Sequence, residues 1–203
     1  MLLITFLITA IIISLSGVMM PGPVLASAIV EGHNDRYAGT KIAVGHAFIE
    51  FPIMFAIFLG LGYIFTYNWV KAAIGTGGGL LLFFLGWKMI EFGKKGRDEE
   101  PVLHNPWILG AIVSASSPYF FLWWATVGAS LIIKAIEIGF FAFILFTIAH
   151  WLCDLAWYSF VSFATFKSKK FWTEKTRAAV LSTCGILMIA FGIYFIISAA
   201  SFI

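Results

Sequence analysis

Six long apolar runs divide this chain of 203 residues, and only short polar connections separate them. The runs cover residues 2–30, 42–65, 72–90, 107–133, 138–166 and 178–203. A helix needs roughly 20 apolar residues to cross a bilayer, so each run is long enough to span. The longest polar stretch, residues 91–105, has the length of a loop. The pattern predicts one domain over residues 1–203, an all-α integral membrane protein with six transmembrane helices.

The composition supports a membrane protein. Hydrophobic residues make up 61% of the chain and charged residues 11%, whereas soluble domains carry about 25% charged residues. The first run has no positive segment ahead of it and exceeds the core of a signal peptide, so we expect it to remain as the first helix. The net charge of +3 favours no nucleic-acid partner, because basic loops suit the anionic headgroups of a lipid bilayer.

A short phrase that occurs twice predicts an internal repeat. His46 precedes Glu50 by four residues, and His150 precedes Asp154 by four residues, 104 positions later. Glycine pairs follow at nearby offsets: Gly39 with Gly139, Gly79 with Gly185, and Gly86 with Gly192. We assign repeat one to about 1–92, a cytoplasmic loop to about 93–105 and repeat two to about 106–203. Three spans in each half imply two inverted repeats, an arrangement typical of secondary transporters. The alternative is chance similarity among apolar helices.

Basic residues predict the orientation in the membrane. Eleven of the 13 Lys and Arg residues lie in the segments 36–41, 88–97 and 167–177, which share one side of the six-helix arrangement. Only Lys71 and Lys134 lie on the other side. The positive-inside rule therefore places these three segments in the cytoplasm and both termini outside.

Glu50 and Asp154 are the strongest candidate site residues. Counting from the ends of their runs at 1.5 Å per residue, each lies near the middle of the bilayer. Ionisable groups at that depth are costly and usually serve a function. Ionised carboxylates would bind an ammonium group, and protonation would couple transport to a proton gradient. The structural alternative is that each acid is only satisfied by its own His, four residues earlier.

His46 and His150 allow three interpretations. Each lies on the same helix face as its acid. They could pack as hydrogen-bonded residues, relay protons or orient the acids. Two imidazoles and two carboxylates also resemble the ligand set of a divalent metal ion.

Two helix breaks complete the candidate site. Pro21, Gly22 and Pro23 interrupt the first run, and Ser117 and Pro118 interrupt the fourth. Proline removes a backbone donor, and freed carbonyls at membrane depth are tolerated only when buried in protein or lining a cavity. We expect these residues to bind substrate. The alternative is a kink, or for the first break the end of the helix.

Other residues are interpreted as structural. Cys153 and Cys184 lie in apolar runs and are expected to pack. The aromatic residues Trp123, Trp124, Trp151, Trp157 and Tyr158 could shape a substrate pocket, but aromatic residues are common in helix packing and at the membrane interface, and we assign them to these roles. The sequence contains no phosphate-loop, His-Glu-x-x-His or Gly-x-Ser-x-Gly motif. We therefore expect no cofactor, no catalytic residues and no enzymatic activity.

Several motifs together resemble the lysine exporter (LysE) superfamily of amino-acid exporters. They are Pro21-Gly22-Pro23, Asp-Arg-Tyr-Ala-Gly at 35–39, Phe-Leu-Gly-Trp-Lys at 84–88, Ser117-Pro118, and Gly-Ile-Tyr at 192–194. The resemblance covers nearly the whole chain. It implies an exporter of amino acids or similar small solutes, driven by the proton-motive force, in a prokaryotic plasma membrane and forming a homodimer. Family members usually carry Asn-Pro followed by Lys in the fourth helix, where this chain has Ser-Pro-Tyr-Phe at 117–120.

Three functional hypotheses remain at this point. The first is a secondary transporter that exports amino acids by proton-coupled antiport. The second is a divalent metal cation exporter that uses His46, Glu50, His150 and Asp154. The third is an intramembrane metalloenzyme in which the same four residues hold a metal that activates water.

Overall fold

The computed structural model describes residues 2–20, 22–94 and 105–202. Within these ranges the chain is helical and contains no strand. The longer elements are α1 (Leu2–Val18), α2 (Pro23–Gly32), α3 (Ala38–Phe58), α4 (Asn68–Lys94), α5 (Pro106–Ala115), α6 (Pro118–Trp123), α7 (Ala129–Ile138), α8 (Phe140–Ser168) and α9 (Glu174–Ala200). Short 3-10 turns, η1 (Leu61–Thr66) and η3 (Lys169–Phe171), follow α3 and α8, and a π-helical segment, η2 (Trp124–Gly128), joins α6 to α7.

The described residues contain five helical segments that are long and apolar enough to cross a membrane, or six if α1 and α2 count as one bent span. α1 and α2 meet at an angle of 72°. α2 begins with Pro23 in its first turn, after Gly22 in an extended conformation. Proline suits this position because its missing N–H would have no partner in the first helical turn anyway. Pro21 lies outside the described residues. The bent first span agrees with the prediction of a break here.

The fourth span differs from the expected continuous helix over residues 107–133. The chain forms a half-length helix, α5, and then a separate spanning segment, Pro118–Ile138. Ser117 between them is extended, with φ −94° and ψ 102°. A residue before proline is pushed out of the helical region by contact with the proline ring. The predicted break is therefore confirmed. It lies about one third of the way along the predicted run, so the spanning segment begins and ends later in the sequence than expected.

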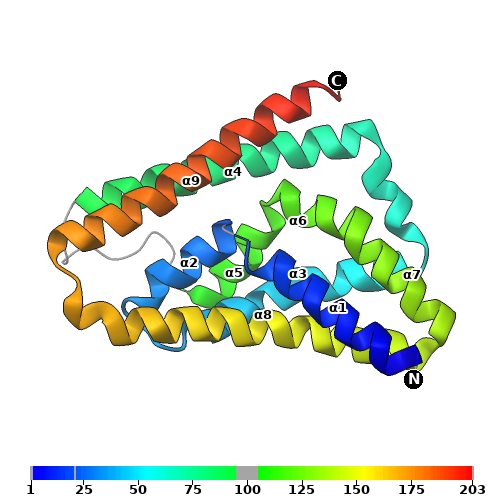
Figure 1. The fold of residues 1–203 in the computed structure, drawn as a ribbon. Helices are drawn as coiled ribbons and strands as arrows, with labels where there is room; N and C mark the ends of the chain where they lie inside the picture. Colours follow the sequence, from blue (N-terminus) through cyan, green and yellow to red (C-terminus); the bar gives the residue numbers. More distant parts are fainter. Residues whose placement is uncertain (1, 21, 95–104, 203) are drawn as a thin grey trace.

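The helices form two groups (Figure 1). α4 and α9 pack along each other as a long pair, with α6 between this pair and the α3–α8 group. α3 packs against α8 and α5, while α1 and α2 both contact α8. Both chain ends lie at one end of the molecule, opposite the ends of α4 and α8 that lead into the basic segments. The three basic segments therefore share one end, although residues 95–104 lie outside the description.

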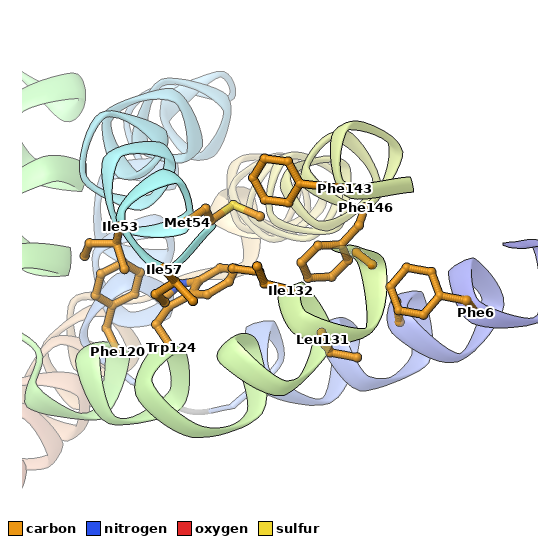
Figure 2. Close-up of a cluster of buried hydrophobic side chains, with 12 residues drawn as sticks. Phe6, Ile53, Met54, Ile57, Phe120, Trp124, Leu131, Ile132, Phe143 and Phe146 are labelled. Atoms are coloured by element: carbon orange, nitrogen blue, oxygen red, sulfur yellow. The ribbon is translucent and has the colours of Figure 1, made fainter. Parts of the chain in front are cut away.

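A large apolar cluster holds the α3–α8 group together. Figure 2 shows side chains from α1, α3, α6–α7 and α8 meeting between these helices. Ile132 and Phe146 are fully buried, and Trp124 is 1% exposed. These residues and Met54 of α3 belong to one buried cluster, next to the polar residues of α3 and α8.

Glycines allow α4 and α9 to approach at backbone contact. A Cβ atom placed on Gly79 would lie 2.7 Å from the carbonyl oxygen of Gly192, and one on Gly86 would lie 2.6 Å from that of Gly185. Small residues at such contacts are typical of helix pairs in membranes, where packing rather than water exclusion drives association. By contrast, Gly39 and Gly139, which the sequence predicts to be equivalent, have different roles in the structure. Gly39 packs on the backbone of Tyr158, whereas Gly139 has φ +137° and begins α8.

We predict that Gly79→Ala destabilises the protein, whereas Gly77→Ala does not. The added methyl group at Gly79 would collide with backbone and Ile196, and overpacking costs about 1–3 kcal/mol. Nothing lies within 4 Å of a Cβ on Gly77, so alanine there would only add helix propensity, about 1 kcal/mol. Thermal unfolding in detergent measures both variants. Equal midpoints would contradict the close α4–α9 contact.

Candidate substrate-binding site

Glu50 and Asp154 face each other at the centre of the α3–α8 pair. Asp154 stands at the midpoint of the 29-residue α8, and Glu50 lies just past the middle of the 21-residue α3. Only 1% of Glu50 and 2% of Asp154 is exposed. The sequence placed both acids at mid-depth on separate helices, and the structure brings them into one cluster with His46 and His150.

One oxygen of Glu50 contacts both histidines. Glu50 Oε1 lies 3.1 Å from His46 Nε2 and 3.1 Å from His150 Nε2. Both contacts are within hydrogen-bond distance, so each requires a proton between nitrogen and oxygen. Glu50 is therefore bound by the histidine of its own helix and by that of the other half of the chain.

Asp154 is held more loosely. Its carboxylate lies 3.9 Å from His46 Nε2 and 3.7 Å from His150 Nε2, beyond hydrogen-bond distance. Among the described residues, neither Asp154 Oδ2 nor Glu50 Oε2 has a hydrogen-bond partner, although both atoms are buried. This arrangement differs from the structural alternative in which each acid pairs with its own histidine. This is unusual, because buried polar atoms are normally paired.

In each histidine, the ring nitrogen that does not contact Glu50 lies within hydrogen-bond distance of a serine hydroxyl. The Ser114 hydroxyl donates to the carbonyl of Gly110 at 2.6 Å, and the same oxygen lies 2.5 Å from His46 Nδ1. Because a hydroxyl has one proton to donate, His46 Nδ1 must be the donor to Ser114. The proton between His46 Nε2 and Glu50 Oε1 is then shared by an imidazolium–carboxylate pair or a neutral imidazole–carboxylic acid pair.

His150 has a matching but freer partner. Its Nδ1 lies 2.7 Å from the hydroxyl of Ser14 on α1. This hydroxyl can donate or accept, so His150 can hold a proton on Nε2 while neutral. The two histidines are consequently not equivalent, although both contact the same carboxylate oxygen.

A cavity of about 90 Å³ opens beside this cluster. Glu50, Asp154, His46 and His150 all line it. No Lys or Arg is among the described lining residues, so its charged groups are the two acids and the histidines. Pockets for drug-sized ligands measure about 300–1,000 Å³, so this cavity suits a small solute.

Aromatic rings form most of the remaining wall. Trp123, Trp124, Phe120 and Tyr158 line the cavity, together with Tyr119, Phe191 and Phe195. The His150 ring lies 5.2 Å from the Trp123 ring and 4.9 Å from the Trp124 ring. Aromatic faces attract ammonium groups within about 6 Å. The interpretation of Trp123, Trp124 and Tyr158 as packing residues alone is therefore incomplete, while Trp151 and Trp157 do not line this cavity.

Both helix breaks reach the cavity. Gly22, Pro23 and Ser117 line it, whereas Pro118 does not and instead lines a second cavity. The first hydrogen bond of α2 runs from the amide of Ala26 to the carbonyl of Gly22. The amides of Val24 and Leu25 precede this bond, and such first-turn donors have no partner within the helix. The N-terminus of α2, which is the positive end of its dipole, therefore lies at the cavity.

Ser14 is the site residue that sequence reasoning missed. One signal was present: Ser14 and Ser114 are 100 positions apart, close to the 104 that separates the two histidines. Phe191 and Phe195 gave no such signal, because phenylalanine is common throughout the apolar runs.

The cluster also has the geometry of a cation site. Ligand atoms of His46, Glu50 and Asp154 all lie within 4.8 Å of one another. Imidazole and carboxylate groups suit several divalent transition metals. The same atoms can equally surround an ammonium group, so the donor set alone does not choose between the two cations.

Comparison with known proteins places the chain in a family. A family model described as "LysE type translocator" matches residues 15–199, which include both helix breaks and all four residues of the central cluster. No curated protein and no solved structure matched the chain. With its buried cluster, its apolar spans and a match over nearly its whole length, the chain belongs to the LysE type translocator family, a family of membrane transporters.

Proposed function

We propose that this protein is a secondary transporter that exports amino acids or related small solutes across the plasma membrane by proton-coupled antiport. The observation that carries the proposal is the pair of buried, unpartnered oxygens, Glu50 Oε2 and Asp154 Oδ2, beside a small aromatic cavity. In a membrane translocator, such oxygens suit the ammonium group of a solute.

The helix break supports a zwitterionic solute. The N-terminal residues of α2 line the same cavity as the two acids. Half-helix N-termini at the bilayer midplane are suited to anionic substrate groups, as in other transporters with broken helices. A carboxylate at the α2 start and an ammonium at Glu50 and Asp154 would satisfy both ends of an amino acid.

Protons and solute would compete for the same atoms. A cation held at Glu50 and Asp154 favours their ionised forms, and protonation removes the charge that holds it. Loss of the solute on one side would then allow the acids to take up protons there. This exchange is the chemical basis of the proposed antiport.

Reciprocal contacts favour the inverted repeat. His46 pairs with Ser114, and His150 pairs with Ser14. If His46 corresponds to His150 and Ser14 to Ser114, the two contacts interchange. The contacts Gly79–Gly192 and Gly86–Gly185 interchange in the same way. We therefore propose two repeats of three spans, with both termini outside the cell; a homodimer also stays a prediction.

The second candidate is export of a divalent metal cation, favoured by the grouping of His46, Glu50 and Asp154. The metal would be cargo, held by these residues and His150. The aromatic wall of the cavity argues for the amino-acid proposal, because rings offer no ligands to such ions.

We predict that Glu50→Gln and Asp154→Asn each abolish export but leave membrane insertion intact. An amide carries no charge and does not titrate, so it cannot exchange a proton for the solute. Loss of a hydrogen bond to a charged group also costs about 1.5–3 kcal/mol, which lowers solute affinity by roughly 10- to 100-fold. Efflux from proteoliposomes under an imposed pH gradient measures the effect. Glu137→Gln, on the exposed face of α7, is the matched control. Normal efflux from both cluster variants would refute the proposal.

Thermal stabilisation separates the two cargoes. We expect amino acids to raise the unfolding midpoint of the purified protein in the presence of a chelator, and the increase to disappear in Asp154→Asn. Stabilisation by Zn²⁺ or Mn²⁺ that is lost in His46→Ala and His150→Ala, with no effect of amino acids, would instead support the metal exporter.

A further inference from the structure

A second cavity lies next to the central one. It measures about 250 Å³ and lies between α4, α9 and the α6–η2 segment. Its walls are mainly apolar and include Phe121, Leu122 and Tyr194. Lys71, near the start of α4, and Ser198, near the end of α9, place it toward the end of the molecule where both chain termini lie.

Phe195 is the one described residue that lines both cavities. Its side chain is 9% exposed and stacks on Phe191, with ring centroids 6.1 Å apart. Phe191 lines only the central cavity. Phe195 therefore lies where the two cavities adjoin.

Near Phe195, α4 packs closely on α9 and on the break in the fourth span. A Cβ on Gly75 would lie 3.2 Å from the carbonyl oxygen of Phe195, so α4 already touches the α9 backbone at this level. A Cβ on Gly78 would lie 2.3 Å from the carbonyl oxygen of Ser116, so α4 also touches the break in the fourth span.

The second cavity differs from the first in its charged residues. Lys71 is its only charged residue among those described, and no acid lines it. The Lys71 ammonium lies 5.3 Å from the centroid of the Phe202 ring, at the rim of the cavity. An anionic group, such as the carboxylate of an amino acid, would be attracted to this position.

We propose that the second cavity is a vestibule of the transport path, where Lys71 attracts the carboxylate of the solute, and that Phe195 closes the passage to the central cavity. This inference rests on the proposed function for the identity of the solute. The passage itself is a property of the protein that can be measured without any solute.

Cysteine labelling tests the passage. In a background with Cys153 and Cys184 replaced by Ala, Ser117→Cys reports on the central cavity and Ser198→Cys on the vestibule. A membrane-impermeant cationic methanethiosulfonate is added to vesicles on the side that carries the chain termini. Ser198→Cys should react in every variant. A closed gate leaves the open state at most about 10% populated, so Phe195→Ala should speed labelling of Ser117→Cys by about tenfold or more.

Phe120→Ala is the matched control, because Phe120 lines the central cavity and does not line the vestibule. Phe195→Leu serves if Phe195→Ala does not fold. Equal labelling rates in the Phe120 and Phe195 variants, or no change in either, would overturn the gate. Failure of Ser198→Cys to react with the polar reagent, while a lipid-soluble maleimide labels it, would show a groove filled by lipid chains and overturn the vestibule.

The role of Lys71 is tested in the same vesicles. Lys71→Gln should slow labelling of Ser198→Cys by an anionic methanethiosulfonate several-fold, without slowing the cationic reagent. Lys134→Gln is the control, since Lys134 is exposed on α7 and lines neither cavity. Equal effects of the two lysine substitutions would remove Lys71 from the proposal. None of these outcomes depends on solute efflux, so failure here is distinct from failure of the proposed function.

Discussion

A single carboxylate oxygen, shared by two imidazoles, organises this protein. An isolated charge in the hydrocarbon of a bilayer is costly. Glu50 Oε1 is stabilised there by two contacts of 3.1 Å, with His46 and His150. Each imidazole is then anchored by a serine on another helix. These five side chains provide hydrogen-bond partners for one another, which allows the polar centre to be buried.

The broken helices follow from the same constraint. Irregular backbone at membrane depth must be buried in protein or line a cavity. The breaks at Gly22–Pro23 and Ser117 both reach the cavity beside the cluster. Pro118 turns the chain away from α5, so that aromatic residues of α6 and η2 come to lie against His46 and His150. In a continuous fourth helix, Phe120 and Trp124 would continue along the axis of α5 instead of turning toward His46 and His150.

The sequence predicted the spans and the central acids because both depend on local spacing. Apolar length identifies a span, and four-residue spacing places His46 with Glu50 on one face. The choice of Glu50 rather than Asp154 as the shared acid depends on contacts between residues 100 positions apart, which no local pattern encodes. Aromatic residues were equally ambiguous. Phe48 is 70% exposed and Phe120 is 9% exposed, although both lie in apolar helices. The inverted repeat, predicted from the two His phrases, stays a prediction.

The serine anchors have a mechanical consequence. His46 links α3 to α5 through Ser114, and His150 links α8 to α1 through Ser14. Both links end on the same atom of Glu50. Any event that shifts this atom therefore pulls on four helices at once, two from each half of the chain. The two hydrogen-bonded histidines thus couple these helices to one another through a single oxygen of Glu50.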